Sequence, residues 1–122
     1  MTLSAGPEAP SRSLAHPTRA QIRLEQVLHA LSDPVRLSVV SALAATEREL
    51  PCSAFPLPVT KSTCTHHFRV LREAGVVRQV YRGTAKLNAL RRQDLDVLFP
   101  GLLDVVLDAA AQQRRQDSAK PL

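Results

Sequence analysis

The chain has 122 residues, enough for one domain, and its 44% hydrophobic and 22% charged residues are typical of a folded globular protein. No run approaches the roughly 20 apolar residues of a membrane span, and two cysteines exclude a disulfide scaffold. Aromatic residues make up only 3% of the chain, which disfavours a surface that stacks single-stranded bases. The first residues contain no apolar secretory segment, so we expect a cytoplasmic protein.

Positive charge is concentrated in one quarter of the chain, although the net charge is only +5. Residues 61–92 contain eight basic residues and one acidic residue. A local basic field of this kind is typical of a protein that binds a polyanion. A solvated basic face without a partner is the alternative, and the residue pattern within the segment distinguishes the two.

The N-terminal part of the sequence predicts a tail followed by two helices. Residues 1–17, which are rich in Ser, Ala and Pro, are expected to form a flexible tail. An apolar stripe at helical spacing predicts a helix over 18–31. Asp33 is a suitable N-cap for a second helix over 34–45, which begins with a proline. Apolar residues surround most of this second helix, as is typical of a helix packed between others.

The central segment predicts a short helical turn and then a third helix. Residues 51–55 can hold one turn before prolines end it. Thr60 is a suitable N-cap for a helix over 61–74, and Gly75 can adopt the positive φ that ends it. One face of this helix is apolar and consists of Cys64, Phe68, Leu71 and Ala74. The opposite face carries small or basic hydrogen-bond donors, namely Ser62, Thr65, His66, Arg69 and Arg72.

Strand chemistry follows the basic helix. Residues 76–81 and 85–90 predict a β-hairpin with a turn at Arg82-Gly83. In the second strand, Leu87 and Ala89 alternate with Lys86 and Asn88, which predicts one apolar face and one polar face.

The C-terminal part predicts one more helix over 93–113, with a break at Pro100-Gly101. It is strongly apolar, and the chain offers no further element to cover it. Residues 114–122 are expected to form a flexible tail.

This order of elements predicts a mainly α (α+β) winged helix-turn-helix domain over 18–113, with about five helices and one β-hairpin wing. A helix is about as wide as the major groove of DNA, so a rigid helix with short donors can reach base edges while basic residues contact phosphates. A basic hairpin beside it can hold the backbone or enter the minor groove.

Three stretches of the sequence carry a family resemblance. They are residues 30–37 (ALSDPVRL), residues 61–77 (KSTCTHHFRVLREAGVV) and the hairpin residues 82–88 (RGTAKLN). With these stretches the sequence resembles the ArsR family of bacterial transcriptional repressors over roughly residues 20–108. The resemblance implies a symmetric homodimer built from the first and last helices. It also implies a double-stranded operator with two-fold symmetry and release from DNA when a ligand or oxidant binds.

The resemblance also implies which residues have roles. The recognition-helix residues expected to face DNA are Lys61, Ser62, Thr63, Thr65, His66 and Arg69. The wing residues expected to contact DNA are Arg78, Tyr81, Arg82, Thr84 and Lys86. The dimer interface is expected to include Ile22, Leu24, Leu28, Leu102, Leu103 and Val106.

Sensor sites of metal-binding relatives are incomplete in this sequence. One family pattern places a pair of cysteines at the short helix, where this chain has only Cys52, and another uses Asp and His ligands on the last helix, which here has Asp104 and Asp108 but no His. A transition-metal site needs three or four ligands, so no metal or cofactor is expected. Cys52 and Cys64 form a candidate redox pair, or alternatively are small buried hydrophobic residues.

The sequence therefore predicts a DNA-binding transcriptional regulator, with a repressor as the function that the resemblance implies. Two alternatives stay open, which are a regulator that senses oxidants through Cys52 and Cys64 and a dimeric protein-interaction module that has lost DNA binding. Catalysis is not expected, because His66 and His67 diverge on a helix and Cys64 has no third orienting group.

Overall fold

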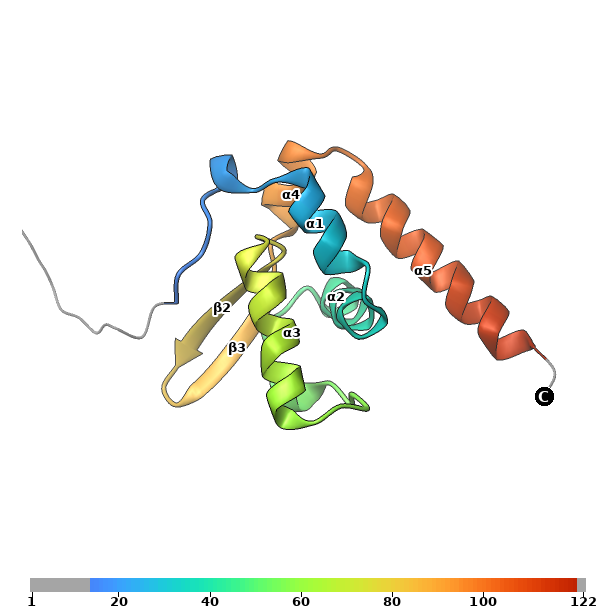
Figure 1. The fold of residues 1–122 in the computed structure, drawn as a ribbon, viewed down its shortest axis with the longest axis horizontal. Coiled ribbons are helices and arrows are strands. Elements are labelled where there is room, and N and C mark those ends of the chain that lie inside the picture. Colours follow the sequence, from blue (N-terminus) through green and yellow to red (C-terminus); the bar gives the residue numbers. More distant parts are fainter. Residues whose placement is uncertain (1–13, 121–122) are drawn as a thin grey trace, which may run out of the picture.

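The computed structural model describes residues 14–120, and the structural statements below refer to these residues. In chain order they form a 3₁₀ turn η2 (Arg19–Gln21), α1 (Leu24–Leu31), α2 (Pro34–Thr46), β1 (Leu50–Pro51), a 3₁₀ turn η3 (Cys52–Ala54), α3 (Lys61–Glu73), β2 (Val77–Arg82), β3 (Ala85–Leu90), α4 (Arg92–Leu98) and α5 (Leu102–Ala119). The predicted winged helix-turn-helix architecture is confirmed. Figure 1 shows α1 and α2 between the α3–hairpin unit on one side and α5 on the other.

The first predicted helix is divided in two, whereas the start of the second is as predicted. Ile22 and Arg23 are extended between η2 and α1. Asp33 caps α2, because its Oδ2 accepts hydrogen bonds from the amides of Val35 at 2.8 Å and Arg36 at 3.1 Å. α2 is packed against α1, α3, β3 and α5, as its apolar circumference requires.

The predicted signals at both ends of α3 are confirmed. Thr60 Oγ1 accepts the Thr63 amide at 3.2 Å, and Gly75 has a φ of +86° after the last turn. A Cβ atom at Gly75 would lie 2.5 Å from Cγ1 of Ile22, so both the backbone conformation and the space require glycine. Phe68 and Leu71 are buried on the inner face of α3.

The wing is part of a three-stranded antiparallel sheet with strand order β1-β3-β2. β1 was not predicted, because it consists of two residues that pair with Asn88 and Leu87 of β3. β2 and β3 pair from Val77↔Leu90 to Arg82↔Ala85, so Gly83 and Thr84 form the turn.

The predicted alternation of β3 is wrong at one position, Asn88. Asn88 was expected to face solvent but is completely buried, whereas Leu87 is half-buried. Gln79, which lies opposite Asn88 on the neighbouring strand β2, is also buried, with 1% of its surface exposed. Hydrogen bonding explains this arrangement, since Gln79 Nε2 donates to Asn88 Oδ1 at 2.7 Å and Asn88 Nδ2 donates to the Leu50 carbonyl at 3.1 Å.

Residues 14–17, which the sequence places in the N-terminal tail, lie along the outer strand β2. His16 Nε2 accepts the Gln79 amide at 3.0 Å, and the Pro17 carbonyl accepts Arg91 Nη1 at 2.8 Å. The His16 contact supplies an acceptor to the edge strand β2. Residues 1–13, the rest of the predicted tail, lie outside the described residues.

The C-terminal helix breaks at Phe99, Pro100 and Gly101, as predicted, but it continues to Ala119 instead of ending near residue 113. Leu103 and Ala110 are buried. Figure 1 shows the rest of α5 extending away from the body of the domain. No single helix within residues 14–120 is long and apolar enough to cross a membrane, and α1 and α2 pass that test only as a pair bent by 100°.

Candidate nucleic-acid interface

The outer face of α3 is an exposed row of hydrogen-bond donors. All six predicted recognition residues, Lys61, Ser62, Thr63, Thr65, His66 and Arg69, are exposed. Thr65 Oγ1 donates to the Lys61 carbonyl at 3.0 Å, and Arg69 Nη2 lies 3.3 Å from Nδ1 of His66. These contacts lie within one helix and leave further donor positions on the Arg69 guanidinium.

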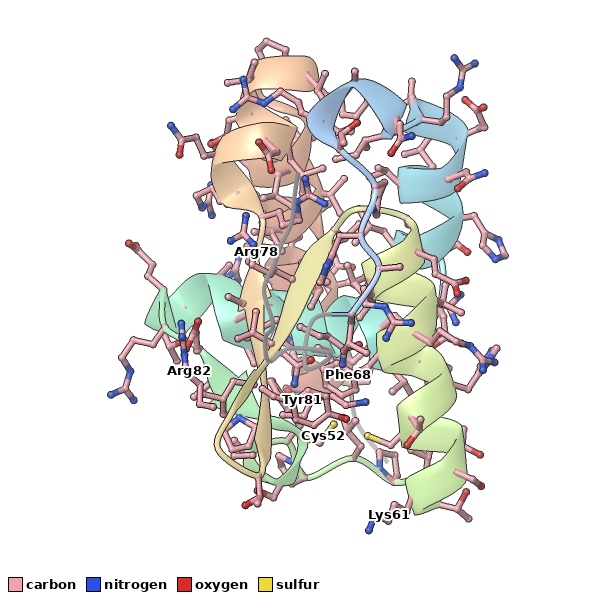
Figure 2. The ribbon with its side chains drawn as sticks, turned by 90° about the vertical axis from the view of Figure 1, so that its left-hand side faces the viewer. Cys52, Lys61, Phe68, Arg78, Tyr81 and Arg82 are labelled. Carbon is pink, nitrogen blue, oxygen red and sulfur yellow. The ribbon has the colours of Figure 1, made fainter. Side chains whose placement is uncertain are left out.

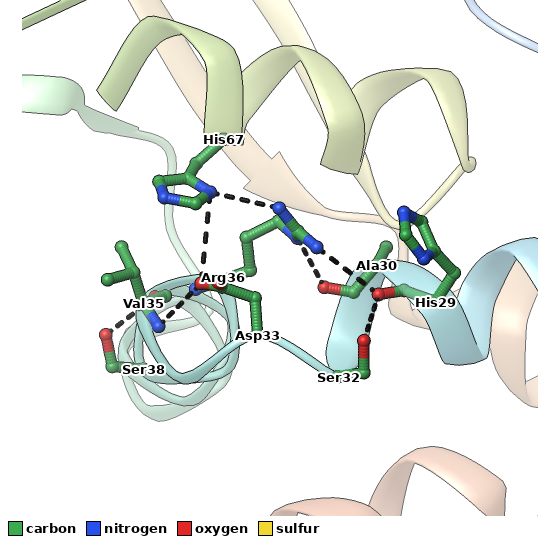
Figure 3. Close-up of polar contacts among 8 residues, drawn as sticks. All are labelled: His29, Ala30, Ser32, Asp33, Val35, Arg36, Ser38 and His67. Carbon is green, nitrogen blue, oxygen red and sulfur yellow. Dashed lines mark hydrogen bonds and ion pairs between the residues drawn. The ribbon is translucent and has the colours of Figure 1, made fainter. Parts of the chain in front are cut away.

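The inner side of α3 is fixed to the α1–α2 corner by a buried polar cluster (Figure 3). Arg36, only 7% exposed, donates to the Ala30 carbonyl at 2.8 Å and lies 3.0 Å from Nδ1 of the buried His67. Since arginine has no acceptor atom, Nδ1 of His67 accepts this hydrogen bond. Asp33 Oδ2 is 3.9 Å from the same nitrogen. The cluster therefore positions α3 relative to the end of α1 and the start of α2.

The charge of Asp33 is maintained despite its contact with the buried cluster. Desolvation raises the pKa of its carboxyl, but hydrogen bonds from the amides of Arg36 and Val35, together with the nearby positive charge of Arg36, lower the pKa overall. The ionised carboxylate then compensates the positive charge of Arg36 and accepts the capping hydrogen bonds of α2.

A second polar network connects α3 to the wing. Arg72 Nη1 donates to Gln79 Oε1 at 2.6 Å. The chain of contacts continues from Gln79 through Asn88 to the Leu50 carbonyl on β1. The network therefore fixes the hairpin relative to α3, and with it the spacing between the two elements that carry the predicted DNA-contact residues.

The predicted wing residues lie on two faces of the hairpin. Tyr81 and Lys86 are cross-strand partners, and Lys86 Nζ lies 5.9 Å from the centre of the Tyr81 ring. Arg78 and Arg82 alternate with Gln79 and Tyr81 along β2 and therefore lie on the opposite face. Figure 2 shows Tyr81 between the hairpin and α3, with Arg82 directed away from α3.

Arg82 is held by an acidic partner that the sequence analysis missed. Its Nη2 and Nε atoms lie 2.9 Å and 3.2 Å from the two carboxylate oxygens of Glu49. The hydrogen bonds from Arg82 hold the pKa of Glu49 below its usual value. Thr84, in the turn beside it, is exposed. The charge of Arg82 is thus already compensated by Glu49.

Cys52 and Cys64, the candidate redox pair, are brought together. Both residues are half-buried, and Cys64 is close enough to Cys52 to influence the pKa of its thiol. Burial, followed by the interaction with Cys64, raises the pKa of Cys52 to about 11. Cys52 is therefore a neutral thiol near neutral pH. Within residues 14–120, no group of three or more His, Cys, Asp or Glu side chains is placed to hold a metal ion.

The predicted dimer residues fall into two classes. Leu24 and Leu28 are 42% and 45% exposed on α1, and Leu102 and Val106 are half-buried on α5. Ile22 and Leu103 belong instead to the core of the chain itself, with 6% and 2% of their surface exposed. Ile22 lies next to Gly75, so most of its surface is already covered within the chain. Val105, which the sequence analysis did not select, is 67% exposed.

Sequence reasoning missed the residues that hold the site in position. Arg36, Gln79 and Asn88 are buried polar residues whose partners lie on other elements. The sequence signal for Gln79 and Asn88 is a polar residue in each strand of the hairpin, at positions that prove to be directly opposite. Arg36 lies in the first turn of α2, after the N-cap Asp33, and no periodic pattern in the sequence indicates that its side chain is buried.

Comparison with known proteins agrees with this geometry. A family model described as a helix-turn-helix domain matches residues 31–80, which include α2 and α3. The chain is 33% identical over 88 residues to YceK of Bacillus subtilis (strain 168), an uncharacterized HTH-type transcriptional regulator, and this match covers 70% of the chain and 87% of YceK.

Two solved structures are similar in fold. An ArsR-like transcriptional regulator from Rhodococcus sp. RHA1 aligns with a TM-score of 0.55 at 24% identity, covering 81% of this chain and 94% of that protein. The transcriptional repressor BigR from Xylella fastidiosa aligns with a TM-score of 0.50 at 25% identity, covering 62% and 85% of the two chains. The chain therefore belongs to the helix-turn-helix transcriptional regulators and has the winged fold of the ArsR family.

Proposed function

We propose that this regulator binds a specific site in double-stranded DNA and acts as a repressor. The observation that supports the proposal best is the outer face of α3. From Lys61 to Arg69 the helix contains hydrogen-bond donors and basic residues but no carboxylate, and every predicted contact residue in this stretch is exposed. A rigid, donor-rich helix of this kind fits the major groove.

The two ends of this face suit different tasks. Lys61 lies at the N-terminus of α3, where free backbone amides and the helix dipole attract a phosphate. Thr65, His66 and Arg69 lie further along the exposed face and are the side chains that we assign to base edges. Arginine can bind guanine with two hydrogen bonds, which discriminates against other bases by about 1–3 kcal/mol.

In the wing, we assign Tyr81, Thr84 and Lys86 to the DNA backbone. Lys86 shares a surface hollow with Lys61 and Thr65 of α3, so one strand of a duplex could contact all three. Arg78 lies on the far face of the hairpin and Arg82 is paired with Glu49. We expect these two arginines to contribute less than Lys86, mainly through long-range attraction.

We propose that the functional unit is a homodimer. Leu24 and Leu28 on α1 and Val105 on α5 are large apolar side chains that the chain leaves exposed. In Figure 1, α5 lies on the side of the molecule away from α3 and the hairpin, so dimerisation there leaves the DNA-binding face accessible. A two-fold dimer presents two copies of α3 to half-sites about one helical turn, ~34–36 Å, apart. A cytoplasmic location is part of the same proposal.

Selection of bound duplexes from a random pool tests the proposal. The expected result is enrichment of one sequence with two-fold symmetry and a half-site spacing of about 10 base pairs. Recovery of DNA without sequence preference would contradict a specific regulator. Failure to recover any DNA would favour the alternative of an interaction module that has lost DNA binding.

A second candidate, a regulator that senses oxidants, has one specific observation in its favour. Cys64, which is part of α3, lies close enough to Cys52 to raise the pKa of its thiol. Loss of two protons and two electrons to a peroxide would form a disulfide and release water. The raised pKa of Cys52 opposes this reaction, because the thiolate is the reactive form. An unchanged response of DNA affinity to peroxide in Cys64→Ser would contradict the mechanism.

A further inference from the structure

A surface hollow of about 410 Å³ lies between α3 and the wing, next to the face assigned to DNA. It is lined on its apolar side by Pro51, Cys52 and Phe68, and on its polar side by Lys61, Thr65 and Lys86. Figure 2 shows Cys52 and Phe68 between the hairpin and α3, and Lys61 at the end of that helix. This volume lies in the range of sites that hold small organic molecules.

The apolar side of the hollow carries no charge. Phe68 is buried at 1% exposure, and burial raises the pKa of Cys52 to about 11, so its thiol is neutral near neutral pH. Gln79 also lines the hollow, but its amide group already bonds Arg72 and Asn88. This part of the hollow therefore favours an apolar group that does not require hydrogen bonds.

The charged residues on the polar side of the hollow are both cations. Lys61 and Lys86 enter from opposite walls, one from α3 and one from β3, and none of the described lining residues is acidic. Glu49, an acid near the wing, is occupied by Arg82. A ligand that matches both sides must combine an apolar body with one anionic group.

We propose that this hollow binds a small organic anion with an aromatic or aliphatic body, such as a carboxylate or sulfonate, and that the bound anion competes with DNA. The competition rests on the proposed function, because Lys61, Thr65 and Lys86 are assigned to DNA there. A DNA phosphate would neutralise the two lysines but would bring no apolar group to the half-buried Pro51 and Cys52. An anion with an apolar body satisfies both sides of the hollow.

Binding is tested on the free protein with 2-naphthalenesulfonate, titrated by the fluorescence of the naphthalene ring. The chain has no Trp and one Tyr, so the protein contributes little background. Lys61→Gln and Lys86→Gln should each weaken binding about two- to fivefold, as expected for a partly exposed ion pair. Arg78→Gln is the matched control, because Arg78 is an exposed cation of the wing that does not line the hollow.

Equal weakening by Arg78→Gln would overturn the site, since it would show only a general attraction to positive charge. Unchanged affinity in both lysine variants would overturn it as well. The uncharged analogue 2-naphthalenemethanol should bind more weakly than the sulfonate to the parent protein. Equal affinity of the two compounds would contradict the role assigned to the lysines.

A competition experiment separates this inference from the proposed function. The sulfonate should displace labelled operator DNA from the parent protein at concentrations that saturate the free hollow. If the protein binds the sulfonate but no DNA, the site is supported and the proposed function fails. If it binds DNA that the sulfonate does not displace at saturation, competition is refuted while the proposed function stands.

Discussion

Asn88→Ala is expected to destabilise the domain strongly, although it replaces a polar residue of the wing. The Asn88 side chain is fully buried and makes two hydrogen bonds, one from Gln79 Nε2 and one to the Leu50 carbonyl. Truncation leaves this buried donor and this acceptor without their partner. Each unsatisfied buried group costs about 1–3 kcal/mol, so the free energy of unfolding should fall by about 2–6 kcal/mol.

Urea denaturation followed by circular dichroism measures this loss. Gln93→Ala, at an exposed position on α4, is the control and should change stability by no more than about 0.5 kcal/mol. The double variant Gln79→Ala/Asn88→Ala should lose less than the sum of the single variants, because the two residues share one hydrogen bond. A loss for Asn88→Ala as small as that of the control would refute the buried network.

Three further changes test how α3 and the wing are held. Gly75→Ala should lower stability by about 1–2 kcal/mol from its positive φ alone, with a further loss from contact with Ile22; thermal denaturation close to that of the parent would argue against it. Burial, reinforced by nearby arginines, lowers the pKa of His16 below 6.5, so its contribution to stability is complete above that pH and decreases as the pH falls. His16→Gln should reduce this dependence in urea midpoints measured on either side of pH 6.5, and an unchanged slope would contradict it. Asp33→Ala should cost about 0.5–2 kcal/mol through loss of the α2 cap, and an unaltered urea midpoint would show that the cap is dispensable.

Local signals explain why much of the fold was predictable. Asp33 and Thr60 mark the starts of α2 and α3, and Gly75 marks the end of α3. Each acts within one turn of its own position, so the sequence contains all the information that is required. The exposed donor face of α3 was predictable for the same reason, because helical periodicity assigns each residue to a side.

Contacts between distant residues explain the errors. Alternation predicted Asn88 to face solvent, but Gln79 and the carbonyl of Leu50 satisfy its side chain inside the domain. Glu49 lies 33 residues before Arg82, and no local pattern relates the two. The packing of Ile22 against Gly75 is likewise not visible in the sequence. In each case the sequence does not show which distant residue a side chain contacts, because the tertiary structure determines those contacts.

The most direct test of the account compares two arginines by fluorescence anisotropy on the selected duplex at fixed salt. Arg69 lies on the exposed face of α3. Arg92 is the first residue of α4, and its Nη1 lies 3.0 Å from Oδ1 of Asp104 on α5. Arg69→Ala should weaken binding roughly tenfold or more through a lost base or phosphate contact, and it should reduce the salt dependence of the affinity. Arg92→Ala removes the same charge and should leave the affinity within about twofold of the parent. Equal losses in the two variants would contradict the assignment of α3 as the element that binds DNA.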